Sequence, residues 1–131
     1  MKLILLAAGK SSRIYREIKL NKCLININGK TLIRHIIDDA FKCGINNIDV
    51  VTGFKPRNII NNLKNYKNIN FIYNNKFKST DMVYSAILAL NRSNTDVIIS
   101  YTDIFYDHTL FKILKKKKIK NITIPYIKNW K

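Results

Sequence analysis

An unbroken apolar run near the N-terminus constrains the fold of this chain more than any other feature. The run extends from Leu3 to Ala8, and Gly9 ends it. It is too short to cross a bilayer and has no polar residues at helical spacing, so it predicts a β-strand that is buried on both faces. Strands of this kind lie inside parallel sheets that carry helices on both sides. The run therefore favours an α/β fold.

The residues that follow this strand suit a phosphate ligand. Ser11 and Ser12 are small enough for a ligand to approach the backbone closely, and Lys10 and Arg13 are cations that can reach it. A Walker A loop would need a glycine where Ile4 stands, and a dinucleotide-binding loop would need two further glycines, so neither motif fits. An ordinary strand-to-loop turn with solvated charges stays open as the alternative on local spacing alone.

Strand and helix patterns alternate along the rest of the chain. After a turn at Asn26–Gly29, strands are predicted at Ile48–Thr52, Asn70–Tyr73, Asp96–Tyr101 and Ile122–Tyr126. Helices are predicted from Thr31, as N-cap, to the residues before Gly44, over Arg57–Leu63 after Pro56, over Thr80–Asn91 with Thr80 or Asp81 as cap, and after a cap at Asp107. This alternation predicts a Rossmann-like three-layer αβα sandwich with a mostly parallel sheet, in one domain over residues 1–131. The nearly all-apolar strand that ends at Tyr101 is expected to be central.

Three polar or glycine positions fall at the predicted carboxyl ends of strands, where such sheets bind ligands. They are the segment Gly9–Arg13, Gly53 and Asp103. A carboxylate at the position of Asp103 is a hard oxygen ligand, suited to Mg²⁺ that is bound together with phosphate oxygens. A loop or capping role for Asp103 is the alternative.

The chain is strongly basic, with 24 Lys and Arg against 8 Asp and Glu and a formal net charge of +16. Lysine, isoleucine and asparagine are frequent in every predicted element, and the dense run Lys115–Lys118 lies at a helix end, so we expect no nucleic-acid partner. A basic RNA-binding module, the alternative, would show a steep salt dependence of RNA affinity. No membrane span and no paired cysteines are visible, so we expect a cytoplasmic protein.

Several motifs resemble those of the nucleotidyltransferases that join a nucleoside triphosphate to a phosphorylated sugar, polyol or amine. The opening string Leu6-Ala7-Ala8-Gly9-x-Ser11-x-Arg13 resembles the family signature L-A-[AG]-G-x-[GS]-x-R. Asn21-Lys22-Cys23-Leu24 stands where the family has a lysine before a leucine, and residues 27–33 and 98–105 resemble two further family segments, the second of which contains Asp103. Residues 79–86 resemble a segment of the choline-phosphate cytidylyltransferase-like branch, with Asp81 in place of its asparagine.

This resemblance implies an enzyme that transfers a nucleoside monophosphate, CMP from CTP as the leading expectation, to a phosphorylated small-molecule acceptor and releases pyrophosphate. Lys22 and Arg13 are then the catalytic residues, and Asp103 binds Mg²⁺. The nucleotide-binding residues implied are Leu6, Ala7, Ala8, Gly9, Lys10, Ser11, Ser12, Arg13, Gly53, Thr80, Asp81 and Ser85.

The resemblance covers only the N-terminal part of the family domain, the nucleotide half. We therefore expect a domain truncated at its C-terminus, without the strands that complete the acceptor pocket and supply a second metal-binding aspartate. The alternative function is a non-catalytic nucleotide-binding remnant that associates with another subunit, and a homo-oligomer is left open.

Overall fold

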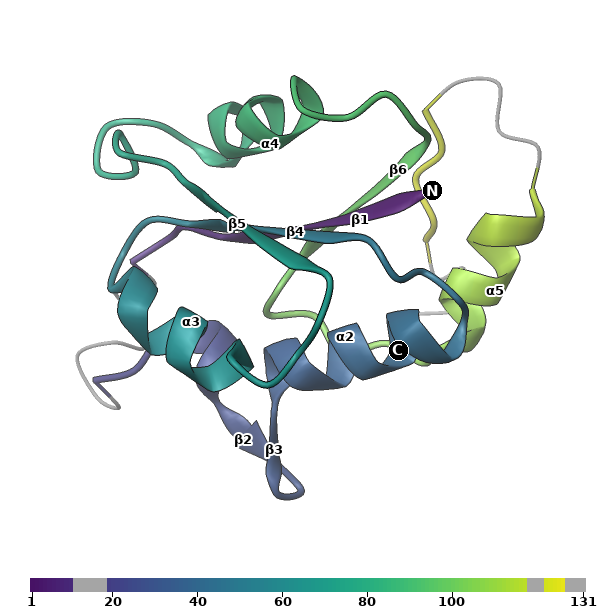
Figure 1. Cartoon of the computed structure of the whole chain (residues 1–131), viewed down its shortest axis with the longest axis horizontal. Coiled ribbons are helices and arrows are strands. Elements are labelled where there is room, and N and C mark those ends of the chain that lie inside the picture. Colours follow the sequence, from purple (N-terminus) through teal and green to yellow (C-terminus); the bar gives the residue numbers. More distant parts are fainter. Residues whose placement is uncertain (11–18, 118–121, 127–131) are drawn as a thin grey trace.

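The computed structural model describes residues 1–10, 19–117 and 122–126. Its centre is a four-stranded parallel sheet in the order β5-β4-β1-β6 (Figure 1). The strands are β1 (Lys2–Ala7), β4 (Ile48–Thr52), β5 (Ile69–Tyr73) and β6 (Val97–Tyr101). The chain winds from β1 through β4 to β5 and then returns to the other side of β1. The strand order therefore reverses beside β1, which is where open α/β sheets bind ligands.

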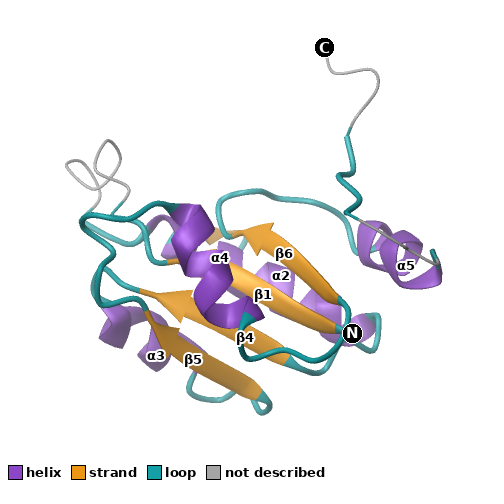
Figure 2. Cartoon of the chain, turned by 90° about the horizontal axis from the view of Figure 1, so that it is seen from above, coloured by secondary structure: helices purple, strands orange, loops and turns teal. Residues whose placement is uncertain are grey.

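Helices cover both faces of this sheet, with α4 on one face and α2 and α3 on the other (Figures 1 and 2). The predicted α/β sandwich is confirmed. In the described part of the chain, no helix is long and apolar enough to span a membrane. The remaining elements are η1 (a 3₁₀ helix, Lys22–Leu24), β2 (Asn26–Ile27), β3 (Lys30–Thr31), α2 (Leu32–Lys42), α3 (Pro56–Leu63), α4 (Met82–Leu90) and α5 (Thr109–Lys116).

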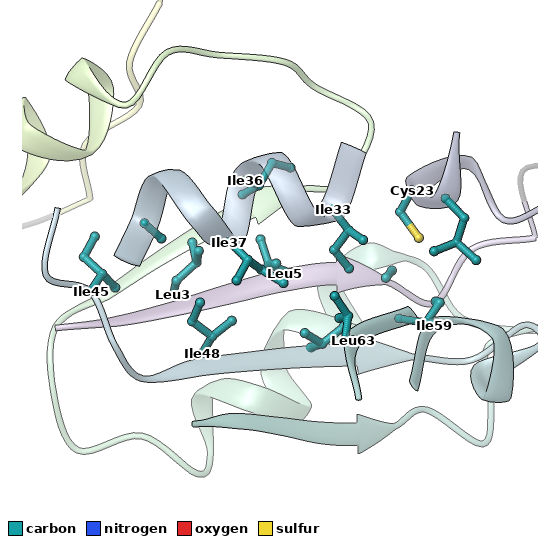
Figure 3. Close-up of a cluster of buried hydrophobic side chains, with 14 of the residues drawn as sticks. Leu3, Leu5, Cys23, Ile33, Ile36, Ile37, Ile45, Ile48, Ile59 and Leu63 are labelled. Carbon is teal, nitrogen blue, oxygen red and sulfur yellow. The ribbon is translucent and has the colours of Figure 1, made fainter. Parts of the chain in front are cut away.

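The side chains of β1 alternate between two separate cores. Leu3 and Leu5 pack against α2 and α3 in the larger core, which Figure 3 shows, and Ile4 packs in the smaller core under α4. All three side chains are fully buried, at 0% exposure. Burial of each contributes about 1.5–3 kcal/mol to folding. The prediction of a first strand buried on both faces is confirmed.

β6 corrects one prediction, because it lies at an edge of the sheet described here and not at its centre. It pairs with β1 alone among the described strands, and Ile99 and Tyr101 are 43% and 42% exposed. An apolar run reports that the faces of a strand are suited to burial. It does not show which backbone edge forms hydrogen bonds with a neighbouring strand, and so the pattern wrongly predicted a central position for β6.

The segment Ile122–Tyr126 corrects a second prediction, since it forms no strand. Ile122, Ile124 and Tyr126 are 93%, 80% and 83% exposed. β-branched residues favour extended backbone locally, but a strand needs a neighbouring edge to pair with. None of the described strands pairs with this segment.

The connections explain how the elements end. Asn28 and Gly29 have φ of 51° and 80°, the positive values that a two-residue hairpin turn of type I′ requires, so the predicted turn joins β2 to β3. Gly44, at φ 71°, follows the end of α2 as predicted. Thr31 stands at the N-cap of α2, but its hydroxyl donates to Asn62 Oδ1 (2.9 Å) and does not cap the helix. Asp107 Oδ1 accepts from the Thr109 N–H (2.8 Å) at the start of α5.

Candidate active site

A cavity of about 300 Å³ lies at the carboxyl ends of β1 and β6. Four segments line it: residues 6–9 at the end of β1, residues 21–23 around η1, residues between 74 and 85, and residues 101–103 after β6. Figure 2 shows α4, which belongs to the third segment, lying across one face of the sheet. The cavity is large enough for part of a nucleotide and stands at the reversal of strand order.

Lys22 and Asp103 meet in this cavity although 81 residues separate them in the sequence. The Lys22 Nζ donates to Asp103 Oδ2 at 2.7 Å. Their side chains are 34% and 38% exposed, so the pair stabilises the fold by no more than about 1 kcal/mol. The pair places one positive and one negative charge in the cavity that Gly9 also lines.

The end of β1 lines the cavity with Leu6 and Ala7, and the loop after it with Ala8 and Gly9. A Cβ added to Gly9 would meet no atom within 4 Å, so open space adjoins this glycine. Lys10 is exposed and does not line the cavity. The other predicted phosphate-loop residues, Ser11, Ser12 and Arg13, lie outside the described residues.

Gly53 was predicted to bind the nucleotide, and this stays a prediction. It follows β4 but does not line the cavity. A Cβ at Gly53 would lie 2.5 Å from Phe77 Cβ and 2.7 Å from the Ala8 carbonyl oxygen. That oxygen accepts a hydrogen bond from the Phe54 N–H at 3.0 Å. Gly53 therefore allows the loop after β4 to pack closely behind the loop after β1.

A buried amide organises the opposite wall of the cavity. Asn74, 1% exposed, donates through Nδ2 to Thr80 Oγ1 (3.1 Å) and Ser85 Oγ (3.0 Å), and accepts from the Lys76 N–H (2.9 Å). The predicted residues Thr80, Asp81 and Ser85 all line the cavity with it. Asp81 caps α4 by accepting from the Tyr84 N–H at 3.1 Å. Sequence reasoning missed Asn74, although a polar residue directly after β5 was a signal of the same kind as Asp103.

Asn21 is a second buried amide that sequence reasoning did not single out. It is 2% exposed, and its Nδ2 donates to the Phe54 carbonyl oxygen at 2.8 Å. Its Oδ1 is buried without a hydrogen-bond partner, the one such side-chain atom within residues 1–10, 19–117 and 122–126. The bond to Phe54 fixes the segment that carries Lys22 to the loop after β4.

Cys23 also lines the cavity, beside Lys22, but its chemistry is that of a buried thiol. Burial is the largest effect on it and raises its pKa to about 12. A hydrogen bond with Thr102, a further cavity residue, opposes this shift only in part. Cys23 is therefore protonated at neutral pH and is not a nucleophile. Phe77, Met82 and Tyr101 complete the lining.

The donor set suits a cation that is shared with a ligand. No group of three or more His, Cys, Asp or Glu residues that could hold a metal occurs in the described part of the chain. Mg²⁺ is commonly bound by one or two carboxylates together with substrate phosphates. Asp103 supplies one carboxylate at the cavity wall, so the residues fit Mg²⁺ that arrives with a phosphate ligand and do not fit a closed metal site.

Comparison with known proteins decides the family. The model of the MobA-like NTP transferase domain matches residues 3–121. The chain belongs to this family. The resemblance read from the motifs at Gly9, Lys22 and Asp103 is thereby confirmed at the level of the nucleotidyltransferase superfamily.

Individual relatives agree with the family. The chain is 32% identical to a CTP:phosphoglutamine cytidylyltransferase of Campylobacter jejuni, over 99% of this chain and 54% of that protein. It resembles the structure of the CTP:phosphocholine cytidylyltransferase of Streptococcus pneumoniae with a TM-score of 0.68 and 25% identity, over 78% of this chain and 44% of that one. A Bacillus anthracis protein solved with sucrose gives a TM-score of 0.74 and 25% identity, over 90% and 51%. The chain thus spans about half the length of these members of the nucleotidyltransferase group.

Proposed function

We propose that this chain binds a nucleoside triphosphate in the cavity and transfers its nucleoside monophosphate to a phosphorylated small molecule, with release of pyrophosphate. The observation that carries the proposal is the convergence of Gly9, Lys22 and Asp103 on one cavity. Gly9 has no side chain, so a triphosphate can approach the backbone closely there. Lys22 provides a positive charge, and Asp103 provides a metal ligand.

The reaction needs positioning and neutralisation of charge more than covalent help from the protein. A phosphate oxygen of the acceptor attacks the α-phosphorus, and the bond from that phosphorus to the pyrophosphate oxygen breaks. The proposed role of Lys22 is to stabilise the negative charge that builds up on the α-phosphate. Asp103 would hold Mg²⁺, which neutralises phosphate charge when bound. Lys10 and Arg13 are proposed contacts of the β- and γ-phosphates.

CTP is the proposed donor, because the relatives from Campylobacter jejuni and Streptococcus pneumoniae are both named as CTP-dependent cytidylyltransferases. For the same reason a phosphorylated amine or amide is the proposed acceptor class, with sugar and polyol phosphates as the wider set. The product would serve as an activated precursor of a cell-surface polysaccharide or phospholipid.

The test combines calorimetric titration of CTP with Mg²⁺ and a pyrophosphate-release assay on a panel of phosphorylated amines, polyols and sugars. Lys22→Met is expected to lower pyrophosphate release by about 10²–10³-fold. Lys42→Met is the matched control, since Lys42 forms a comparable ion pair with Asp39 (2.8 Å) but does not line the cavity. Absence of binding of any nucleoside triphosphate would refute the proposal.

Nucleotide binding without catalysis, in association with another subunit, is the second candidate. Exposed apolar side chains beside the cavity favour it: Val83 and Ile87 on α4 are 58% and 46% exposed, and Ile99 on β6 is 43% exposed. Apolar surface next to an open strand edge is typical of protein–protein contacts. CTP binding without pyrophosphate release on every acceptor would support this candidate over the enzyme.

A further inference from the structure

Lys22 forms an ion pair with the carboxylate of Asp103, the group that a metal ion would need as a ligand. Its Nζ lies 2.7 Å from Asp103 Oδ2. The backbone that carries Lys22 is held firmly, because Asn21 is bonded to Phe54 and the side chain of Cys23 is buried at 3% exposure. The movable part of this arrangement is therefore the flexible stem of Lys22, which is one-third exposed.

Within the described part of the cavity, few other charged groups compete for this pairing. Among the described residues that line the cavity, the charged side chains are Lys22, Asp81 and Asp103. Asp81 is engaged in capping α4 through the Tyr84 N–H. Among the described charged residues of the cavity, Lys22 and Asp103 are thus each other's partner.

A free divalent cation and a metal–nucleotide complex meet this pair differently. A free cation has to displace the Lys22 ammonium from a single carboxylate and then remain beside that positive charge, which repels it. A triphosphate brings new anionic partners for the ammonium and further oxygen ligands for the metal at the same time. Exchange of partners is therefore favourable only when phosphate and metal arrive together.

We propose that Lys22 closes Asp103 to free divalent cations and releases it when a triphosphate enters, so that the site takes its metal only as the metal–nucleotide complex. This inference rests on the proposed function and adds an order of binding to it. The coupling is reciprocal, because a nucleotide that raises the affinity for the metal is itself bound more tightly when the metal is present. Lys22 therefore has two roles: it pairs with Asp103 before the nucleotide binds, and it contacts phosphate afterwards.

Mn²⁺ is the probe for Mg²⁺ in the test, with the whole chain and without nucleotide. Free Mn²⁺ is measured by electron paramagnetic resonance, and its position by paramagnetic broadening of the amide signals of residues 102–104. Lys22→Met is expected to raise the affinity of this site for Mn²⁺ by at least about fivefold over the wild type. The double variant Lys22→Met with Asp103→Asn should lose the gain, and circular dichroism confirms that each variant is folded.

Lys42→Met serves as the control for net charge. It removes the same charge from the same kind of ion pair, that with Asp39, outside the cavity. If Lys42→Met raises the affinity as much as Lys22→Met, or if the wild type binds Mn²⁺ at Asp103 as tightly as Lys22→Met, the inference is overturned. A variant that binds metal better while it catalyses worse would support it.

Addition of CTP to the wild type completes the test and separates the two hypotheses. The nucleotide is expected to bring about Mn²⁺ broadening at residues 102–104 that the wild type lacks without it. If CTP fails to bind at all, the proposed function fails, and the exchange of partners fails with it. If CTP and Mg²⁺ bind and pyrophosphate is released, but Mn²⁺ alone already reaches Asp103 in the wild type, only the order of binding is wrong.

Discussion

Replacement of Gly53 by alanine is expected to destabilise the fold by about 1–4 kcal/mol, even though Gly53 does not line the cavity. The new Cβ would lie 2.5 Å from Phe77 Cβ and 2.7 Å from the Ala8 carbonyl oxygen. Neither atom can swing away by a change of rotamer, because Phe77 Cβ is attached directly to its backbone and the Ala8 oxygen is itself a backbone atom that accepts the Phe54 N–H at 3.0 Å. The loops after β1 and β4 therefore have to separate.

The magnitude combines two effects and a smaller opposing one. Overpacking in a well-filled region costs about 1–3 kcal/mol, and weakening of the Phe54–Ala8 hydrogen bond adds about 0.5–1.5 kcal/mol. Loss of backbone freedom in the unfolded chain returns less than about 1 kcal/mol, so destabilisation prevails. Urea unfolding followed by circular dichroism should show a midpoint lower by about 1–2 M.

Gly9→Ala is the matched control, because a Cβ at Gly9 meets nothing within 4 Å. We expect it to leave the free energy of unfolding within about 0.5 kcal/mol of the wild type. Since that Cβ would enter the space proposed for phosphate, affinity for CTP should fall in Gly9→Ala. A Gly53→Ala variant as stable as the wild type would refute the packing role of Gly53.

Three further predictions follow from single side chains. Burial raises the pKa of the Cys23 thiol from 9.0 to about 12, so above pH 9 the thiol of the unfolded chain loses its proton before that of the folded chain. The free energy of unfolding should therefore fall between pH 9 and pH 12, and more steeply in the wild type than in Cys23→Ala, as urea titrations at alkaline pH can measure. Lys115 Nζ donates to the carbonyl oxygen of Cys43 (2.9 Å) at the end of α2, so Lys115→Met should lower the melting temperature whereas Lys116→Met should not. Asn21→Asp places a buried carboxylate against the Phe54 carbonyl oxygen, so at pH 7 it should destabilise the fold more than Asn21→Ala does. The difference between the two variants should shrink at low pH, where the carboxyl is protonated, as urea unfolding at pH 7 and pH 4 would show.

Local patterns in the sequence predicted most of the fold. The apolar run from Leu3 to Ala8 predicted a strand that is indeed buried in two cores, and β4 begins and ends where its residues indicated. The shared edge of parallel strands placed Gly9 and Asp103 together before any coordinates were known. These features were predictable because the periodicity of side chains determines which faces of a strand or helix are buried.

Features that depend on distant neighbours were not predictable in this way. β6 was expected at the centre and lies at the edge described here, and Ile122–Tyr126 was expected to be a strand and is not one. Both errors concern pairing of backbone edges, which the side-chain pattern does not encode. Asn21 was missed because its partner, the Phe54 carbonyl oxygen, stands 33 residues away.

The sequence by itself determined a parallel α/β sheet and the strand end at which its ligand residues gather, because face burial and strand direction follow from local periodicity and short connections. Only the tertiary structure decided that Gly53 lets the loops after β1 and β4 pack closely, that two buried amides hold the walls of the cavity, and that Lys22 pairs with Asp103. The physical reason is that close packing and ion pairing are set by atoms that meet across dozens of residues.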